Sequence, residues 1–239
     1  MKRLMHAEGR SVPRMFVEEI RRSLGDADHL EILDAGCGRG WRLDLDGIPH
    51  RITGVDSDAE AVRHRRELVQ DLEESYVGDL LDVDLPTSAF DVVHSSFVLE
   101  HLSGAEQALD RFFQWLRPGG LLLLEIPDRD SAFGFASRIT PFWLHVLYRR
   151  YVFHQPTAGK PGHAPYPTFY DPVTSARGMR EYCRVHGHAI LQEYGVPISL
   201  ARFGRLAPLF TATLKLVELL SVGRLASSHS NLAYVVRKQ

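Results

Sequence analysis

The segment EILDAGCGRG (residues 31–40), with Asp56 sixteen positions after its last glycine, decides how this chain can fold. An apolar run leads into a turn that holds three glycines, and a helix-like segment follows. Glycine lets backbone amides approach a ligand closely, and ligands of open α/β sheets lie beyond the carboxyl ends of the strands. The segment therefore predicts a cradle for a nucleotide-like ligand at the end of a first β-strand.

Strand-like and helix-like runs alternate outward from this turn. Alternation of this kind is typical of an α/β protein with a doubly wound, mostly parallel sheet. The pattern predicts helices over 11–24, 58–70, 105–116 and 173–186, and strands over 30–33, 51–56, 76–79, 90–96, 121–126, 189–195 and 231–237.

Two insertions interrupt the alternation. Residues 127–172 carry seven prolines and ten of the chain's 23 aromatic residues, and residues 199–222 place apolar side chains at helical spacing between basic ones. The second insertion could pack on the domain, contact a membrane peripherally, cover a ligand or form a homodimer contact. We divide the chain into an N-terminal helical segment (1–29) and one domain (30–239) that contains both insertions.

The composition indicates a globular protein of one domain, with 239 residues of which 44% are apolar and 24% charged. No apolar run approaches the roughly 20 residues that span a bilayer, and the N-terminus lacks the apolar stretch of a signal peptide. Two cysteines make a disulfide framework implausible, so we expect a cytoplasmic protein. Residues 1–126 hold 14 basic and 24 acidic residues, and residues 127–239 hold 14 and 6. The basic second half suits an anionic partner or simply a solvated surface.

The glycine spacing bears on the kind of ligand. A dinucleotide site favours G-x-G-x-x-G, whereas Trp41 stands here at the third position. Asp34, just before the turn, disfavours a diphosphate and suits a cation such as an ammonium group. Asp56 ends the second strand, where a carboxylate can accept hydrogen bonds from ribose hydroxyls, and Gly78-Asp79 ends the third.

Residues 32–40, 54–56, 78–79, 90–102 and 116–120 resemble, in order and spacing, the motifs of class I S-adenosylmethionine-dependent methyltransferases. The resemblance extends to the broad bacterial group that includes the quinone-biosynthesis methyltransferases. It implies a Rossmann-like fold with a seven-stranded sheet and S-adenosylmethionine as cofactor. The residues that the resemblance places along the cofactor, from the methionine end through the ribose and adenine to its other side, are Asp34, Gly36, Gly38, Asp56, Ser57, Asp79, Leu80, Ser95 and Phe97.

The first insertion follows the fifth strand of the implied fold and is expected to form a lid over the acceptor. Its aromatic residues could wall a pocket, while Arg149, Arg150 and Lys160 could clamp an anionic group. We therefore expect a small-molecule acceptor that is aromatic or anionic. Candidates for a catalytic base are His163, His154, Tyr166 and His101.

A metal site is not expected. Some quinone O-methyltransferases use a Glu-His dipeptide with an earlier acid to bind a divalent metal, and Glu100-His101 matches the dipeptide. The position of the earlier acid is occupied here by Phe97.

The expected activity is methyl transfer to a small or medium acceptor in secondary-metabolite, quinone or glycan-precursor biosynthesis, with oxygen favoured over nitrogen or carbon. A dinucleotide-dependent oxidoreductase and a non-catalytic cofactor-binding module remain alternatives. Nucleic acid is not an expected partner, because the segment after the fourth strand reads Ser95-Ser96-Phe97-Val98 instead of Asn/Asp-Pro-Pro-Tyr and the chain is net acidic.

Overall fold

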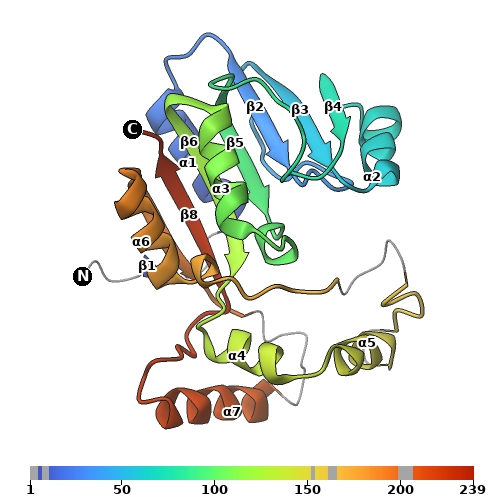
Figure 1. The fold of residues 1–239 in the computed structure, drawn as a ribbon, viewed down its shortest axis with the longest axis vertical. Coiled ribbons are helices and arrows are strands. Elements are labelled where there is room, and N and C mark those ends of the chain that lie inside the picture. The colour runs from blue at the N-terminus through green and yellow to red at the C-terminus, as the bar shows by residue number, and fades with distance from the viewer. Residues whose placement is uncertain (1–4, 7–10, 152–153, 161–165, 199–206) are drawn as a thin grey trace.

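The computed structural model describes residues 5–6, 11–151, 154–160, 166–198 and 207–239. An eight-stranded sheet forms its centre, in the order β1-β7-β8-β6-β5-β2-β3-β4 (Figure 1). Strand β8 is antiparallel to both of its neighbours, and every other pair is parallel. The strands are β1 (Met5–His6), β2 (Leu30–Ala35), β3 (His50–Asp56), β4 (Glu74–Val77), β5 (Phe90–Ser96), β6 (Leu116–Pro127), β7 (Ala189–Val196) and β8 (Asn231–Arg237).

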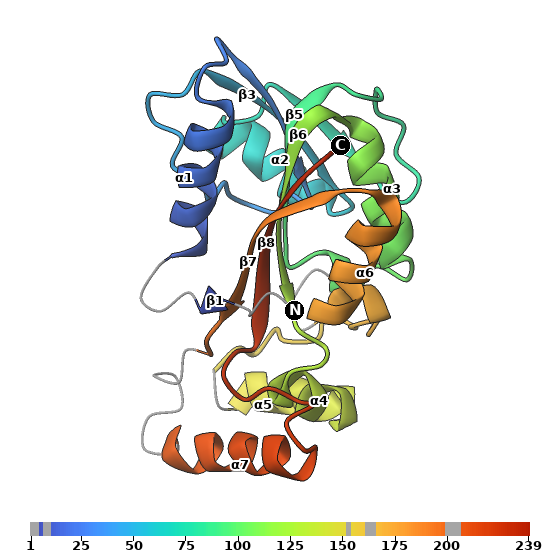
Figure 2. The same cartoon turned by 90° about the vertical axis from the view of Figure 1, so that its left-hand side faces the viewer.

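Helices cover both faces of the sheet, with α1 on one side and α3 and α6 on the other (Figure 2). Helices α4, α5 and α7 form a separate layer beyond the end of the sheet (Figures 1 and 2). The helical elements are α1 (Val12–Leu24), α2 (Ala59–His64), the π-helical η1 (Arg65–Val69), the short η2 (Leu99–His101), α3 (Ala105–Trp115), α4 (Ala132–Ile139), α5 (Phe142–Tyr151), the short η3 (Pro172–Thr174), α6 (Ala176–His186) and α7 (Ala207–Leu220).

The sheet separates two apolar cores. Ile32 packs in the core under α1, and its neighbour Leu33 packs in the core under α3, because successive side chains of a strand point to opposite faces. Both residues are fully buried. The strands are therefore apolar on both sides, as expected for a parallel sheet covered by helices on both faces.

The predicted doubly wound, mostly parallel α/β fold is confirmed, with one strand more than the seven predicted. The additional strand is β1, which pairs with β7 at the sheet edge. Two residues are too few to show a strand period, so the sequence carried no signal for it. The helix predicted over 58–70 begins as α2 but continues as the π-helical η1.

The helix expected directly after the glycine turn is absent: residues 41–49 contain no helix. Leu43 and Leu45 are buried at a spacing of two residues, which suits extended backbone rather than a helix. Gly47 has a positive φ of 75° and Pro49 follows, and both oppose a helix here. This segment instead fills the core under α1.

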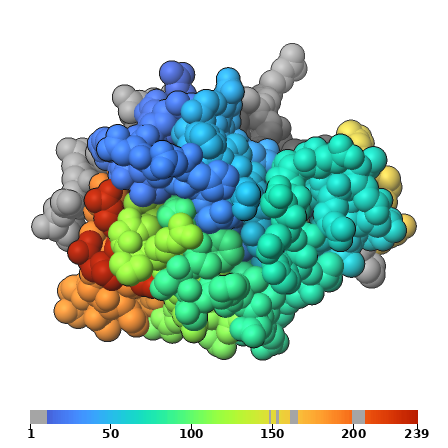
Figure 3. Space-filling model, turned by 90° about the horizontal axis from the view of Figure 1, so that it is seen from above, coloured from blue at the N-terminus to red at the C-terminus, as the bar shows by residue number. Residues whose placement is uncertain are grey.

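The two insertions pack against each other. The rings of Phe133 in α4 and Phe210 in α7 lie 6.2 Å apart, and an isolated β-bridge joins Ser131 to Ala226. The end of the molecule opposite this layer is formed mainly by the first half of the chain, with α6 and the C-terminus at one side (Figure 3). None of the helices in the described part of the chain has the length and apolar character that a membrane crossing requires.

Candidate active site

The glycine turn is anchored to β3 by its own backbone. The amides of Gly36 and Cys37 both donate to the carbonyl oxygen of Val55, at 2.8 and 3.0 Å, and the amide of Gly38 donates to Asp56 Oδ2 at 2.8 Å. A diphosphate needs free amides and a helix N-terminus, but these three amides are committed and no helix follows. The turn therefore disfavours a dinucleotide.

Two of the glycines are required by geometry. Gly36 has a φ of +78°, and a Cβ atom there would lie 2.2 Å from Val98 Cγ2. Gly38 has a φ of +55°, but a Cβ atom would meet nothing within 4 Å. The space in front of Gly38 is therefore open to a ligand, while Gly36 allows the close approach of β5's following loop.

Asp34 lies at the end of β2 and is held on both oxygens. Its Oδ2 accepts a hydrogen bond from Arg65 Nη1 at 3.0 Å, and its Oδ1 accepts one from His94 Nδ1 at 2.9 Å. Only 3% of Asp34 is exposed. Because Arg65 already balances the carboxylate, a ligand ammonium would meet less negative charge than the sequence alone suggested.

Arg65 is a site residue that the sequence analysis missed. Its fully buried guanidinium bonds Asp34, Asp71 Oδ1 at 2.7 Å and the carbonyl of Cys37 at 2.8 Å. Burial by itself would lower the pKa of Arg65, but hydrogen bonds to Asp71 and Asp34 raise it. Arginine is almost always exposed unless it is paired, so a helical pattern gives no sign that this one lies under the turn.

Cys37 is the one thiol within the glycine turn. Burial, with smaller contributions from the charges of Asp34 and Asp56, raises the pKa of its thiol to about 12. The thiol therefore stays protonated at neutral pH and is not a nucleophile in this site.

The carboxylate of Asp56 is oriented by two backbone amides. Oδ2 accepts from Gly38, and Oδ1 accepts from Asp58 at 2.9 Å. A carboxylate oxygen has two lone pairs, so each oxygen can accept one further hydrogen bond from a ligand. Asp56 thereby couples the glycine turn to the position expected for ribose hydroxyls.

A cavity of about 840 Å³ lies at the carboxyl ends of β2, β3, β4 and β5. It brings together residues from these four strand ends and from the first insertion. Its lining includes the predicted positions Gly36, Gly38, Asp56, Ser57, Asp79, Leu80, His101 and Tyr166, together with Phe169.

A second cavity, of about 510 Å³, shares Gly36, Gly38 and Arg39 with the first. Asp34, Trp41 and Arg42 also line it. The indole Nε1 of Trp41 is buried and has no hydrogen-bond partner among the described residues. This donor and the two arginines suit a carboxylate, such as that of a methionine moiety.

Two of the predicted cofactor residues line neither cavity. Ser95 is fully buried and its Oγ has no partner among the described residues. Phe97 has a φ of +59°, and its amide donates a hydrogen bond to the backbone carbonyl of Glu125. The Arg42 guanidinium lies 5.8 Å from the centre of the Phe97 ring. Ser96, between them, lines the smaller cavity and accepts from Arg42 at 3.4 Å. Ser95 is thus buried away from both cavities, and partly buried Phe97 contacts Arg42 instead of lining either one.

The side of the larger cavity where the acceptor is expected is built by η2 and the end of the first insertion. His101 Nδ1 lies 2.8 Å from the carbonyl oxygen of Pro167, and its ring packs edge-on against Tyr166 at 5.6 Å. A carbonyl only accepts, so Nδ1 carries the hydrogen and Nε2 of the neutral ring holds a free lone pair. Phe169 is fixed next to them by its amide, which donates to the Glu100 carbonyl at 2.6 Å.

Glu100 is a buried acid directly behind His101. Burial raises its pKa to about 7, and the charge of Glu125 contributes. Its Oε2 has no partner among the described residues, and its Oε1 lies 4.0 Å from His101 Nε2. Burial also raises the pKa of Glu125, which accepts from Ser96 at 3.2 Å.

Of the other predicted base candidates, only His154 lies among the described residues, and it is exposed and does not line the cavity. His163 lies outside the described residues. Among the lid's aromatic residues that the structure describes, Tyr166 and Phe169 line the pocket as expected. Trp143 and Tyr151, by contrast, are 62% and 74% exposed. The helical spacing of apolar residues in the sequence does not show whether they point into the cavity or toward solvent.

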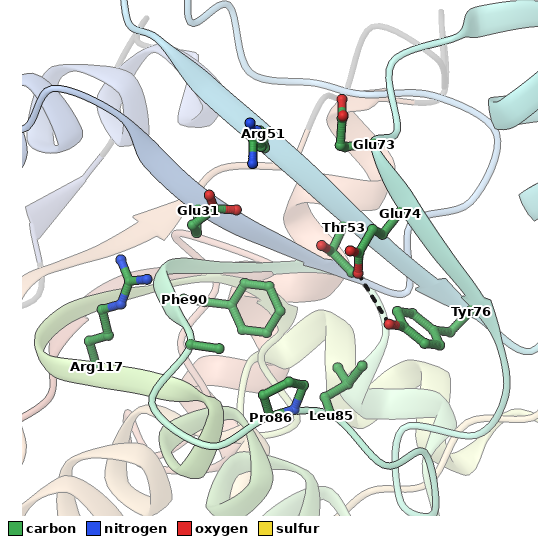
Figure 4. A pocket seen from close by; sticks show the side chains of 11 residues that line it. Glu31, Arg51, Thr53, Glu73, Glu74, Tyr76, Leu85, Pro86, Phe90 and Arg117 are labelled. Carbon is green, nitrogen blue, oxygen red and sulfur yellow. Dashed lines mark hydrogen bonds between the residues drawn. The ribbon is translucent and has the colours of Figure 1, made fainter.

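A third cavity, of about 300 Å³, lies at the amino ends of the strands (Figure 4). Its lining includes Glu31, Arg117 and Tyr76, whose hydroxyl donates to Glu74 at 3.1 Å. It contains none of the strand-end residues described above. The described part of the chain also holds no group of three His, Cys, Asp or Glu side chains placed to bind a metal ion.

Comparison with known proteins identifies the family to which the fold belongs. The family model for the methyltransferase domain matches residues 8–193. A Mycolicibacterium smegmatis protein named "Probable S-adenosylmethionine-dependent methyltransferase" is 36% identical over 119 residues, 49% of this chain and 46% of that protein. The malonyl-[acyl-carrier protein] O-methyltransferase of Yersinia pestis is 29% identical over 127 residues, 51% of this chain and 44% of that protein.

A solved structure shows the same fold with a ligand. The 1,6-didemethyltoxoflavin-N1-methyltransferase of Burkholderia thailandensis, which has S-adenosylhomocysteine bound, superposes with a TM-score of 0.54 at 16% identity. The superposition covers 96% of this chain and 79% of that one. The chain spans about half the length of the curated relatives that it matches. Its fold, its strand-end residues and the family match agree: the chain belongs to the methyltransferase-domain family, the class I enzymes whose cofactor is S-adenosylmethionine.

Proposed function

We propose that this chain transfers a methyl group from S-adenosylmethionine to an oxygen atom of a small or medium acceptor. The observation that carries the proposal is that the two cavities adjoin at the glycine turn. They share Gly36, Gly38 and Arg39, and the larger one is also lined by Asp56 and His101, so we treat them as one cleft. A cofactor in this cleft would have its reactive end beside the acceptor side of the larger cavity.

The residues present fit the cofactor. S-adenosylmethionine, when bound, supplies a methyl group on a positively charged sulfur. In our proposal Asp56 accepts hydrogen bonds from the ribose, Asp79 and Leu80 frame the adenine, and Arg42 with Trp41 Nε1 holds the methionine carboxylate. The chain's contribution is to hold and orient the reactants and to exclude water.

The state of His101 favours an oxygen acceptor. Because Nδ1 donates to Pro167, Nε2 is free to take the proton of an acceptor hydroxyl as the oxygen reacts. A carboxylate acceptor would need no base. The name of the Yersinia pestis relative, a malonyl-[acyl-carrier protein] O-methyltransferase, also supports an oxygen acceptor.

We place the acceptor among quinone, glycan-precursor or secondary-metabolite intermediates, with an aromatic ring or an acidic group. Tyr166 and Phe169 offer apolar surface, and Arg39 offers positive charge, on the same cavity wall. Cys37 and Cys183 are free thiols, in keeping with a reducing cytoplasm.

The test begins with the cofactor. Calorimetric titration with S-adenosylhomocysteine should show binding that Asp56→Ala weakens about tenfold to hundredfold, since a hydrogen bond to a charged group contributes about 1.5–3 kcal/mol. Asp84→Ala, at an exposed aspartate, serves as the control. Radiolabelled methyl transfer to phenols, carboxylates and amines then identifies the acceptor atom. Binding without transfer to any acceptor would leave a cofactor-binding module, and absence of binding would exclude the proposal.

A further inference from the structure

Exposed apolar side chains gather on the outer side of α7. Leu209, Leu216 and Leu220 are 67%, 53% and 75% exposed, and their spacing of seven and four residues places them on one side of the helix. Leu214, on the opposite side, is 5% exposed, and Phe210 packs on Phe133 of α4. Helix α7 is thus apolar on two sides, and only one side is covered in the described structure.

Helix α5 presents a similar stripe. Trp143, Leu147 and Tyr151 recur every four residues and are 62%, 38% and 74% exposed. Apolar residues of this size are mostly buried in the sheet domain, where the cores under α1 and α3 take them up. Tryptophan and tyrosine have an apolar body and a polar tip, which suits a boundary between water and a less polar phase.

The charges around these stripes are almost all positive. Residues 131–160 contain Arg138, Arg149, Arg150 and Lys160 and no acidic residue. Residues 207–228 contain Lys215 and Arg224 against Glu218, whose Oε2 accepts a hydrogen bond from Ser227 at 2.6 Å. The layer formed by α4, α5 and α7 therefore combines exposed apolar stripes with a net positive charge.

We propose that the exposed apolar stripes of α5 (Trp143, Leu147, Tyr151) and α7 (Leu209, Leu216, Leu220) dock on an anionic lipid surface. The leucine and aromatic stripes enter the boundary between headgroups and acyl chains, and the basic side chains contact the lipid phosphates. With 14 residues, α7 is about 21 Å long and lies along the surface instead of crossing it. The segment that carries Tyr166 and Phe169 runs between α5 and the sheet (Figure 1), so docking brings the acceptor side of the cleft close to the lipid.

The charge distribution distinguishes a lipid surface from a second copy of the chain. A two-fold dimer pairs a surface with itself, so it would bring two surfaces of net positive charge together. Like charges across an interface disfavour association, whereas an anionic surface compensates them. The docking surface does not depend on the proposed methyl transfer, and the vesicle test below needs no activity.

The test uses the full chain and vesicles. Flotation with vesicles of phosphatidylglycerol and phosphatidylcholine should carry the protein along, while vesicles of phosphatidylcholine alone should bind at least about tenfold less. Tryptophan emission should shift to the blue on binding, because Trp143 is exposed whereas Trp115 is 1% exposed and already in an apolar environment. High salt should weaken the binding.

Matched variants separate the contribution of the apolar stripes to vesicle binding from that of the basic side chains. Leu216→Ser with Leu220→Ser, and separately Arg149→Glu with Lys215→Glu, should each lower vesicle binding by about tenfold or more. The control pair Leu68→Ser and Val185→Ser removes side chains that are 73% and 61% exposed on other elements and should bind like the unmodified protein.

Circular dichroism and S-adenosylhomocysteine affinity show whether each variant is folded. The proposal is overturned if the folded protein does not bind anionic vesicles, or if the leucine pair leaves vesicle binding unchanged. It is also overturned if sedimentation shows an oligomer that the leucine substitutions dissociate, because a second copy then covers the stripe.

Discussion

At the scale of single residues, buried charge is concentrated beneath the glycine turn. Arg65 bonds Asp34, Asp71 and the carbonyl of Cys37, and His94 holds the second oxygen of Asp34. Removing one partner of such a group leaves an uncompensated buried charge, which costs about 3–5 kcal/mol. The network therefore holds the turn in the conformation that opens the space in front of Gly38.

His101 gives a prediction about the acceptor atom. His101→Ala should lower kcat for hydroxyl acceptors by about a hundredfold to ten-thousandfold, because the free Nε2 lone pair that takes the proton is lost. Carboxylate acceptors and the affinity for S-adenosylhomocysteine should change little. Steady-state kinetics on both acceptor types measure the difference, with His29→Ala, at the far end of β2, as control. Equal losses on hydroxyl and carboxylate acceptors would contradict the role as base.

Glu100 gives a prediction about stability and pH. Its folded-state pKa of about 7 lies above the ordinary value of 4.5, because burial disfavours the charged form. The stability that protonated Glu100 supports is fully present below pH 4.5 and is lost as the pH rises through about 7. The loss amounts to about 3 kcal/mol, at about 1.4 kcal/mol per pKa unit.

Glu100→Gln removes this titration. The variant should be more stable than the unmodified protein at about pH 8, and the advantage should disappear as the pH falls toward the ordinary pKa of the carboxyl. Urea unfolding across the pH range measures it, with Glu106→Gln at an exposed position of α3 as control. A difference that stays constant with pH would rule out Glu100 as the titrating group.

At the scale of elements, the loops at the carboxyl ends of β2 and β5 meet at one contact. Gly36 faces Val98, and Val98 directly precedes η2, which carries Glu100 and His101. The cofactor side and the acceptor side of the cleft therefore touch where glycine has no side chain. A substitution that adds a side chain in the glycine turn should therefore displace η2.

Gly36→Ala tests this contact. The added methyl group would lie 2.2 Å from Val98 Cγ2, at a φ of +78°. We expect a loss of stability of about 1–3 kcal/mol from overpacking and at least about tenfold weaker S-adenosylhomocysteine binding. Gly47→Ala is the matched control, since its φ is +75° but no atom lies within 4 Å of the added Cβ. If both variants lose cofactor affinity equally, backbone strain and not the contact with Val98 is responsible.

At the scale of the whole molecule, the sheet domain and the first insertion line different parts of the larger cavity. The strand ends supply Asp56 and Asp79 to the larger cavity, and the end of the first insertion supplies Tyr166 and Phe169. Several apolar side chains of the layer formed by α4, α5 and α7, among them Trp143, Tyr151 and Leu216, are exposed. Cofactor affinity and acceptor affinity should therefore respond to different parts of the chain.

Phe169→Ala tests this division. Its ring is 46% exposed on the cavity wall, and an acceptor that covers it would lose this apolar contact. We expect the acceptor KM to rise about tenfold while the S-adenosylhomocysteine Kd stays unchanged. Tyr76→Ala, in the cavity at the opposite end of the sheet, should change neither constant. A weaker cofactor Kd in Phe169→Ala would show that the insertion also serves the cofactor.

Periodicity along the chain was not enough to predict the segment after the glycine turn or the direction that α5 faces. The alternating Trp41, Leu43 and Leu45 form an extended segment where a helix was expected, because they fill a core whose shape depends on α1. The outward stripe on α5 has the same helical spacing as a core-facing stripe would have. In both cases the conformation or orientation of the segment depends on the surface against which it packs, and that surface comes from a distant part of the chain.

Short-range periodicity and spacing were enough to predict β2 to β8, the glycine turn and the strand-end acids Asp56 and Asp79 from the sequence. Only the tertiary structure decided that Arg65 neutralises Asp34, that His101 and not His154 reaches the cleft, and that α5 and α7 expose their apolar sides. The physical reason is that burial, pairing of charges and the direction of a side chain depend on residues far apart in sequence. Those residues meet only when the sheet has assembled.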